Sequence, residues 1–81
     1  MGFTIANLKK GERGVITDIS SEAIPLKLLE MGCLPGNIVE LIQVAPFEDP
    51  MYLEINGCHL AIRKETAALI LIEKILDEQT N

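Results

Sequence analysis

The sequence predicts a small all-β barrel with one inserted helix. Short runs rich in β-branched and aliphatic residues are separated at close spacing by turns that contain glycine or proline, which is typical of small barrels. Only one segment, around residues 23–31, repeats its apolar residues at helical spacing. The 81 residues are 48% hydrophobic and include no tryptophan, so Ile, Leu and Val must form the core. This content suffices for one compact domain spanning residues 1–81.

The first predicted strand, residues 15–19, is rich in β-branched residues and follows a turn with two glycines, Gly11 and Gly14. Residues 4–8 lead into this turn. A basic G-x-x-G loop clamps nucleic-acid backbone in KH domains, but there it joins helices, whereas a strand follows here. A P-loop would also need a Lys-Ser/Thr pair after its glycines. We therefore expect a plain turn that binds no nucleotide.

A helix is predicted to begin near Ala23 or Pro25, after the polar residues 20–22. Its core-facing stripe has offsets of four and seven and consists of Ile24, Leu28 and Met31. Leu26 lies outside this stripe. It is therefore the apolar residue of the helix that we expect to face solvent.

The helix is expected to end at Gly32, which suits a left-handed stop, and Pro35-Gly36 then fits a type II turn. The next strand, residues 38–45, is apolar on both faces. Two-sided burial beneath a covering helix is therefore expected for it. Pro46 ends this strand and opens a second turn.

Two further strands are predicted to form a hairpin. Residues 51–55 alternate between apolar and polar side chains, and Asn56-Gly57 then gives the strongest short signal for a type I′ turn. The partner strand, residues 58–63, is expected to point two apolar side chains inward, Leu60 and Ile62.

The C-terminal part is predicted to hold a single helical turn at residues 64–68, a final strand at residues 69–75 and a frayed end at residues 77–81. The total is five to six strands with one inserted helix. This count favours an SH3-like barrel over a sandwich, which would need more strands.

The net charge of −5 arises from twelve acidic and seven basic residues. Binding to nucleic acid or to an anionic membrane surface requires a basic face, so both partners are disfavoured. The longest apolar run, residues 67–72, is far too short to span a bilayer, and Lys9 and Lys10 interrupt the amino end before a signal peptide can form. A cytoplasmic protein without membrane insertion is expected.

Cys33 and Cys58 are far apart in the chain, and two buried thiols are expected in a reducing compartment, with a disulfide as the alternative. Adjacent strand residues point to opposite faces, so Cys58 is expected to pack inward and His59 outward. A metal at His59 would need Glu54, Asp49 or another molecule as a further ligand, and a ferrous site needs a His and carboxylate cluster. We therefore predict no metal site, no cofactor and no catalytic residue.

Several short elements keep a specific order and spacing from Leu8 to Glu73. They are Leu8-Lys9-x-Gly11-x-x-Gly14, Lys27-Leu28-Leu29-Glu30-Met31-Gly32, Leu34-Pro35-Gly36, Val39-Glu40-Leu41, Ala45-Pro46-x-x-Asp49-Pro50, Gly57 and Leu60-Ala61-Ile62-Arg63-Lys64-Glu65. Together they resemble the FeoA family, small proteins of bacterial ferrous iron transport. The resemblance covers nearly the whole chain.

The resemblance implies an SH3-like barrel with a helical insertion. It also implies a cytoplasmic accessory role beside FeoB, the membrane transporter that carries a cytosolic GTPase domain. Two departures from the family pattern stand out. The family often has glycine where this chain has Glu48, and the family helix tends to carry more basic residues than Lys27 alone.

We predict that the protein acts by contact with the FeoB-type transporter and its cytosolic GTPase domain. On the helix, Leu26 would be the anchor, and Lys27 and Glu30 would set the register, although simple coverage of the core explains this helix equally well. Glu48 and Asp49 form either an ordinary turn, in which Asp49 bonds its own backbone, or an acidic tip for a basic partner surface.

Two alternative functions remain at this stage. The protein could activate GTP hydrolysis in its partner through an arginine finger, for which Arg13 and Arg63 are the only candidates. It could instead be a regulatory partner of a metal-dependent transcriptional repressor, although its acidic balance opposes direct contact with DNA. Weak association into homo-oligomers is also left open.

Overall fold

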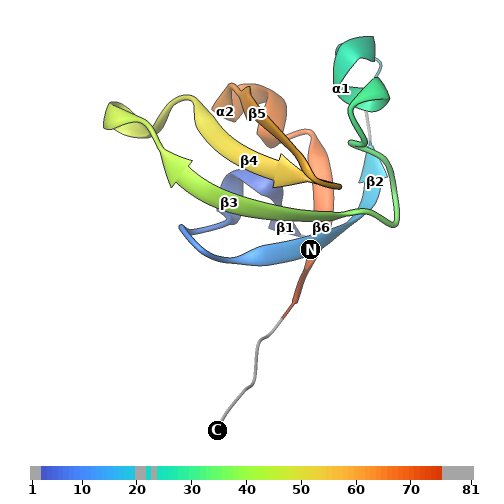
Figure 1. Ribbon diagram of the computed structural model, residues 1–81, viewed down its shortest axis with the longest axis horizontal. Coiled ribbons are helices and arrows are strands. Elements are labelled where there is room, and N and C mark those ends of the chain that lie inside the picture. Colours follow the sequence, from blue (N-terminus) through green and yellow to red (C-terminus); the bar gives the residue numbers. More distant parts are fainter. Residues whose placement is uncertain (1–2, 20–21, 23, 76–81) are drawn as a thin grey trace, which may run out of the picture.

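The alternating apolar residues fold into antiparallel strands that form one curled sheet (Figure 1). The computed structural model describes residues 3–19, 22 and 24–75, without the side chain of Glu48. In this part of the chain the strand order is β1-β6-β2-β3-β4-β5. The strands are β1 (Phe3–Thr4), β2 (Arg13–Ile19), β3 (Ile38–Val44), β4 (Met51–Ile55), β5 (Cys58–Ile62) and β6 (Ile70–Ile75).

The described residues form four short helices that connect the strands, and none of these helices is long and apolar enough to cross a membrane. They are the 3₁₀ helices η1 (Ile5–Asn7) and η2 (Pro46–Glu48) and the α-helices α1 (Leu26–Glu30) and α2 (Lys64–Ala67). Helix α2, which follows β5, contacts η1, which follows β1. The elements next to the two outermost strands therefore meet and close the barrel.

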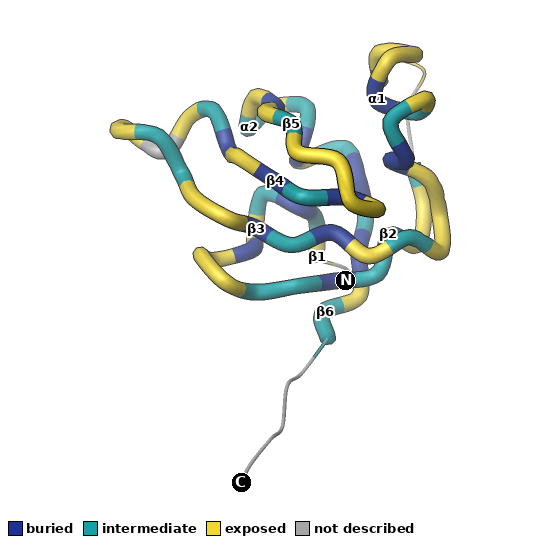
Figure 2. Tube along the Cα trace, viewed as in Figure 1, coloured by how far each residue is buried: buried dark blue, intermediate teal, exposed yellow. Residues whose placement is uncertain are grey.

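The core lies inside the curl and is entirely apolar (Figure 2). No polar or charged side chain in the described residues is buried. The buried residues are Ile5, Leu8, Ile16, Ile24, Leu28, Cys33, Val39, Leu41, Met51, Leu53, Ile55, Ile62, Ala67, Ile70 and Ile72. The alternation predicted for β4 is confirmed, because Met51, Leu53 and Ile55 all point into this core.

Strand β3 corrects the prediction of two-sided burial. Val39 and Leu41 are buried, but Ile38 is 45% exposed and Ile42 is 38% exposed. The reason is that α1 lies beside β5 and the far end of β2 (Figure 1), so no described helix covers the outer face of β3. A bulge between Leu41 and Gln43 also shifts the register against β4, and such bulges bend a strand.

Helix α1 is shorter than predicted. Pro25 is its N-cap and Met31 its C-cap, while Ala23, Ser20 and Ser21 lie outside the described residues. Ile24 and Leu28 of the predicted stripe are buried, whereas Met31 is only half-buried because it sits at the rim of a groove. The predicted helix stop is confirmed by Gly32, whose φ is +105°.

The turns follow their predicted chemistry. Asn37 N–H donates to the Leu34 carbonyl across Pro35-Gly36, and Gly36 has φ +97°, as a type II turn requires. Asn56 and Gly57 both have positive φ, at 53° and 84°, which is the type I′ geometry. The loop around Gly11 is a plain turn, as expected, in which Glu12 N–H donates to the Lys9 carbonyl.

The structure also corrects predictions about the first strand and about Cys58. The opening segment forms a two-residue strand followed by η1, and β2 begins at Arg13 because this residue pairs with both Glu40 and Ile75. Cys58 was expected to be buried but is exposed, because it begins the outermost strand beside a turn. Cys33 is buried as expected. Residues 77–81 lie outside the described residues.

Candidate docking groove

On helix α1, the three side chains that were predicted to contact the partner are all exposed to solvent. Leu26 is 67% exposed, and Lys27 and Glu30 are also exposed. Leu28 holds the helix to the core because its side chain is buried. The exposure predicted for Leu26 is therefore confirmed, and the helix carries an unburied apolar side chain next to two charges.

A groove of about 330 Å³ separates α1 from β5. Its described lining is mainly apolar, and the only charged side chains in that lining are two cations, Lys27 and Arg63. Neither cation pairs with an acidic side chain of the described residues. The remaining lining residues are Pro25, Leu28, Met31, Leu60, Ala61, Ile62 and Thr66.

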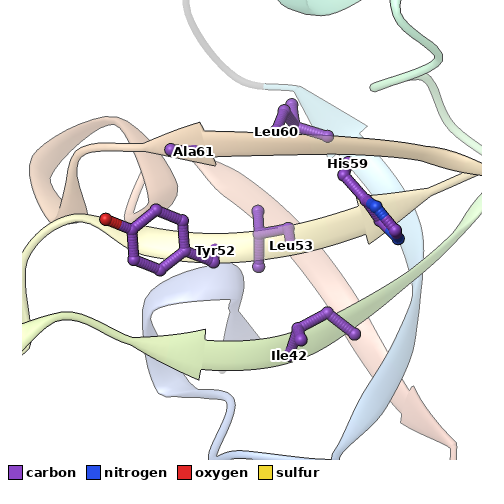
Figure 3. A pocket seen from close by; sticks show the side chains of 6 residues that line it. All are labelled: Ile42, Tyr52, Leu53, His59, Leu60 and Ala61. Atoms are coloured by element: carbon purple, nitrogen blue, oxygen red, sulfur yellow. The ribbon is translucent and has the colours of Figure 1, made fainter.

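A second hollow of about 420 Å³ lies on the outer face of the sheet, over β3, β4 and β5. Figure 3 shows Tyr52 and His59 toward its two ends, with Ile42 on the β3 side and two β5 residues on the other. The His59 Nε2 atom lies 3.5 Å from a Glu54 carboxylate oxygen. The lining is completed by Leu53, Leu60 and Ala61.

The two hollows share Leu60 and Ala61, so they flank the same strand. Strand β5 is the last strand of the sheet. This arrangement was not predicted from the sequence. The absence of charged residues and proline between Cys58 and Ile62 was a signal for a strand that could pair further. The sequence does not show that this strand lies at the edge of the sheet, because that position depends on the order of the strands.

The turn between β3 and β4 lies at the opposite end of the molecule from α1, so the predicted site residues do not form one cluster (Figure 1). The Asp49 carboxylate accepts a hydrogen bond of 2.9 Å from the Lys64 N–H at the start of α2. It therefore caps a helix fifteen residues away and does not bond its own backbone as the turn interpretation expected. The side chain of Glu48 lies outside the described residues.

Phe47, in the same turn, is 98% exposed and has a φ of +69°. A left-handed backbone is uncommon for an aromatic residue and costs energy. The turn is held by the Ala45 N–H, which donates to the Pro50 carbonyl at 3.1 Å, and by the Asp49 bond to α2. No pattern in the sequence had indicated a special role for Phe47.

The described residues contain no group of three or more His, Cys, Asp or Glu side chains that could hold a metal ion. Burial raises the pKa of the Cys33 thiol, which keeps the thiol protonated and weakens it as a nucleophile. Arg63 is the N-cap of α2 and lines the groove, whereas Arg13 begins β2. The arrangement therefore offers contact surfaces and cations, but no assembled catalytic set among the described residues.

The model of the FeoA domain family matches residues 3–74. A fusion of Fe(2+) transport protein A with the Fe(2+) transporter FeoB, from Porphyromonas gingivalis, is 32% identical over 78 residues. This alignment covers 95% of the chain but 9% of the fusion protein. The chain thus corresponds to a small part of that relative.

Two solved structures show the same fold. The FeoA-like protein of Clostridium acetobutylicum is 26% identical with a TM-score of 0.85, and the match covers 99% of this chain and 94% of that one. The zinc-complexed FeoA of Stenotrophomonas maltophilia, described as an SH3 domain protein, is 20% identical with a TM-score of 0.76. That match covers 88% of this chain and 89% of the other. The predicted SH3-like barrel is confirmed.

Proposed function

The chain belongs to the FeoA family, and on that premise we propose that it regulates a FeoB-type ferrous iron transporter by docking on the transporter's cytosolic part. The observation that carries this proposal is the groove between α1 and β5. It combines an apolar lining, an exposed Leu26 at its helix and two cations without acidic partners among the described residues. Such a site suits contact with another protein.

The fusion protein of Porphyromonas gingivalis supports the choice of partner. In that relative, the A protein and the transporter are joined in one polypeptide. Covalent linkage raises the effective concentration of one module beside the other, which is useful when the two modules bind each other. For the present chain, the transporter's cytosolic part is accordingly the partner that we propose.

Binding to the purified cytosolic part of the FeoB-type transporter tests the proposal. Isothermal titration calorimetry with and without GTP should detect binding by the wild-type protein. We expect Leu26→Ala and Lys27→Glu each to weaken binding by roughly tenfold or more, because Leu26 is the exposed apolar side chain of α1 beside the groove and Lys27 is a cation of the groove lining. Phe3→Ala is the matched control, since Phe3 is an exposed apolar residue on β1. Absence of binding by the wild-type protein in both nucleotide states would refute the proposal.

A second candidate function is stimulation of the partner's GTP hydrolysis. It is favoured by Arg63, which is exposed at the rim of the groove and has no acidic partner among the described residues. A docked protein could thereby present an arginine to the nucleotide. Arg63→Lys keeps the charge but lacks the planar guanidinium, so turnover should fall while binding persists. Unchanged GTP turnover after addition of the wild-type protein would exclude this function.

A further inference from the structure

Among the strands that the structure describes, β5 is the last of the sheet and pairs only with β4, so no other described strand covers its second backbone edge. The Ile55–Cys58 pair closes the two-residue turn, and such a pair exchanges both ladder hydrogen bonds. Along an antiparallel ladder, hydrogen-bonded pairs alternate with pairs that are not hydrogen-bonded. His59 and Ala61 belong to the pairs that are not hydrogen-bonded, so their N–H and C=O groups point away from β4. No turn, loop or cap hydrogen bond in the described residues engages these four groups.

The opposite edge of the sheet is protected in a way that β5 is not. Strand β1, at that edge, has only two residues. Short strands, bulges, prolines and charges are the usual devices that prevent further strands from adding to an edge. Strand β5 has five residues, keeps a regular register with β4 throughout, and contains neither proline nor a lysine, arginine or acidic residue. It is the more accessible template of the two.

Both hollows border β5, the strand beside which an added strand would lie. Successive side chains of an extended segment point to opposite faces. A segment paired with β5 would therefore send alternate side chains into the groove beside α1 and into the hollow on the outer face of the sheet. Both hollows are mainly apolar, and both include Leu60 and Ala61.

The charges at the α1 groove select the chemistry of the segment. Lys27 lines one wall and Arg63 lies beside the end of β5, and no acidic residue is among the described lining. An acidic side chain that enters this groove would attract both cations, and its apolar neighbours in the segment would point to the hollow on the outer face of the sheet. A basic segment would instead be repelled.

We propose that β5 is the docking edge, to which an extended segment of the partner with alternating apolar and acidic residues adds as a further antiparallel or parallel strand. The inference rests on the proposed function for the identity of the partner, the transporter's cytosolic part. It goes further by naming the backbone edge and the chemistry of the segment. The main-chain hydrogen bonds supply affinity, and the two hollows supply selectivity.

Ala61→Pro is the direct test, because proline removes the N–H that points away from β4 and leaves the β4–β5 ladder intact. Phe3→Ala is the control, because Phe3 lies on β1 and lines neither hollow. Two probes are titrated: the transporter's cytosolic part, and a synthetic peptide that alternates valine with glutamate. We expect Ala61→Pro to weaken binding of both by roughly tenfold or more, with Phe3→Ala close to wild type. A peptide that alternates valine with lysine should not bind.

The outcomes separate this inference from the proposed function. If the cytosolic part binds wild type and a folded Ala61→Pro equally well, the edge inference is wrong and the proposed function stands. If the cytosolic part does not bind wild type at all, the proposed function fails. The valine–glutamate peptide then decides the edge inference alone: binding that Ala61→Pro abolishes supports it, and no binding overturns it.

Amide hydrogen exchange supplies a test that needs no variant to fold. In the free protein the His59 and Ala61 amides should exchange fast, while the Leu60 and Ile62 amides, which face β4, should be protected. The complex with the valine–glutamate peptide should protect all four. Protection of the His59 and Ala61 amides in the free monomer would show that another part of the chain already pairs with the β5 edge. Protection that rises as the protein dimerises would show that a second copy does so. Either result would overturn the inference.

Discussion

The groove beside α1 and the turn between β3 and β4 are both exposed, yet they use their charged residues differently. At the groove, Lys27 and Arg63 face an apolar hollow and pair with no acidic side chain of the described residues. At the turn, the Asp49 carboxylate is already bonded to the start of α2. A charge engaged inside the fold contributes to stability, whereas a charge left without a partner beside an apolar hollow remains available to another molecule.

The largest effect should come from the residue that attaches α1 to the core. Leu28 is buried beneath the helix, so Leu28→Ala should lower the free energy of unfolding by about 2–4 kcal/mol and remove one wall of the groove. Its neighbour provides the control, because Leu26→Ala should change stability by less than about 0.5 kcal/mol. Urea unfolding measures both. Equal destabilisation by the two variants would mean that α1 does not pack as described.

The next largest effect is expected at the turn between β3 and β4, where a substitution should change stability without changing partner binding. Asp49→Ala removes the acceptor for the Lys64 N–H, so we expect a loss of about 1 kcal/mol in the free energy of unfolding. Asp49→Asn retains an acceptor oxygen and should lose less. Partner affinity should be unchanged in both variants. A stable Asp49→Ala protein that no longer binds its partner would make the turn a contact surface.

Phe47 offers a smaller effect of opposite sign. Its side chain is 98% exposed, so its removal sacrifices almost no buried area. Asparagine tolerates the left-handed backbone better than phenylalanine does, and Phe47→Asn should therefore stabilise the protein by up to about 1 kcal/mol. Thermal unfolding gives the sign. A Phe47→Asn protein with normal stability and strongly reduced partner binding would assign the anchoring role to this turn.

The smallest effect concerns Glu12, a surface carboxylate outside both regions. It accepts a hydrogen bond from the Lys9 N–H at 2.7 Å and lies 3.0 Å from the Lys74 ammonium, and these contacts lower its pKa. A lowered folded-state pKa contributes stability above the ordinary carboxyl pKa, and this contribution is lost as the pH falls through the lowered value.

Glu12→Gln should therefore reduce stability near neutral pH and approach wild type in acid. Urea midpoints at about pH 7 and about pH 3 measure this difference. A stability gap between the two proteins that widens on acidification would contradict the sign of the shift. Because the carboxylate is on the surface, salt should also narrow the gap at neutral pH.

Most of the fold was predictable because local signals agree with the final structure. The alternation in β4, the Asn56-Gly57 turn and the helix stop at Gly32 each depend on nearby residues alone. The exposure of Ile38 and Ile42 was not predictable, since an apolar strand reveals its burial only when the covering elements are placed. Cys58 was placed wrongly for the same reason, as its exposure follows from the edge position of β5.

The candidate site was predictable only in part. Leu26 stands out from the helical stripe, and Lys27 and Glu30 follow from the same spacing. The β5 wall did not stand out, because Leu60 and Ala61 come to line the groove with α1 only through the sheet order and the distant position of α1 in the sequence. The role of Asp49 likewise required a contact with Lys64, fifteen residues away.

Docking of the partner along α1 and β5 can be observed in amide NMR spectra recorded while the transporter's cytosolic part is titrated into the protein. We expect the amides of residues 25–31 and 58–63 to shift or broaden, while those of residues 45–51 stay unchanged. Changes centred on residues 45–51, with α1 and β5 unaffected, would contradict it.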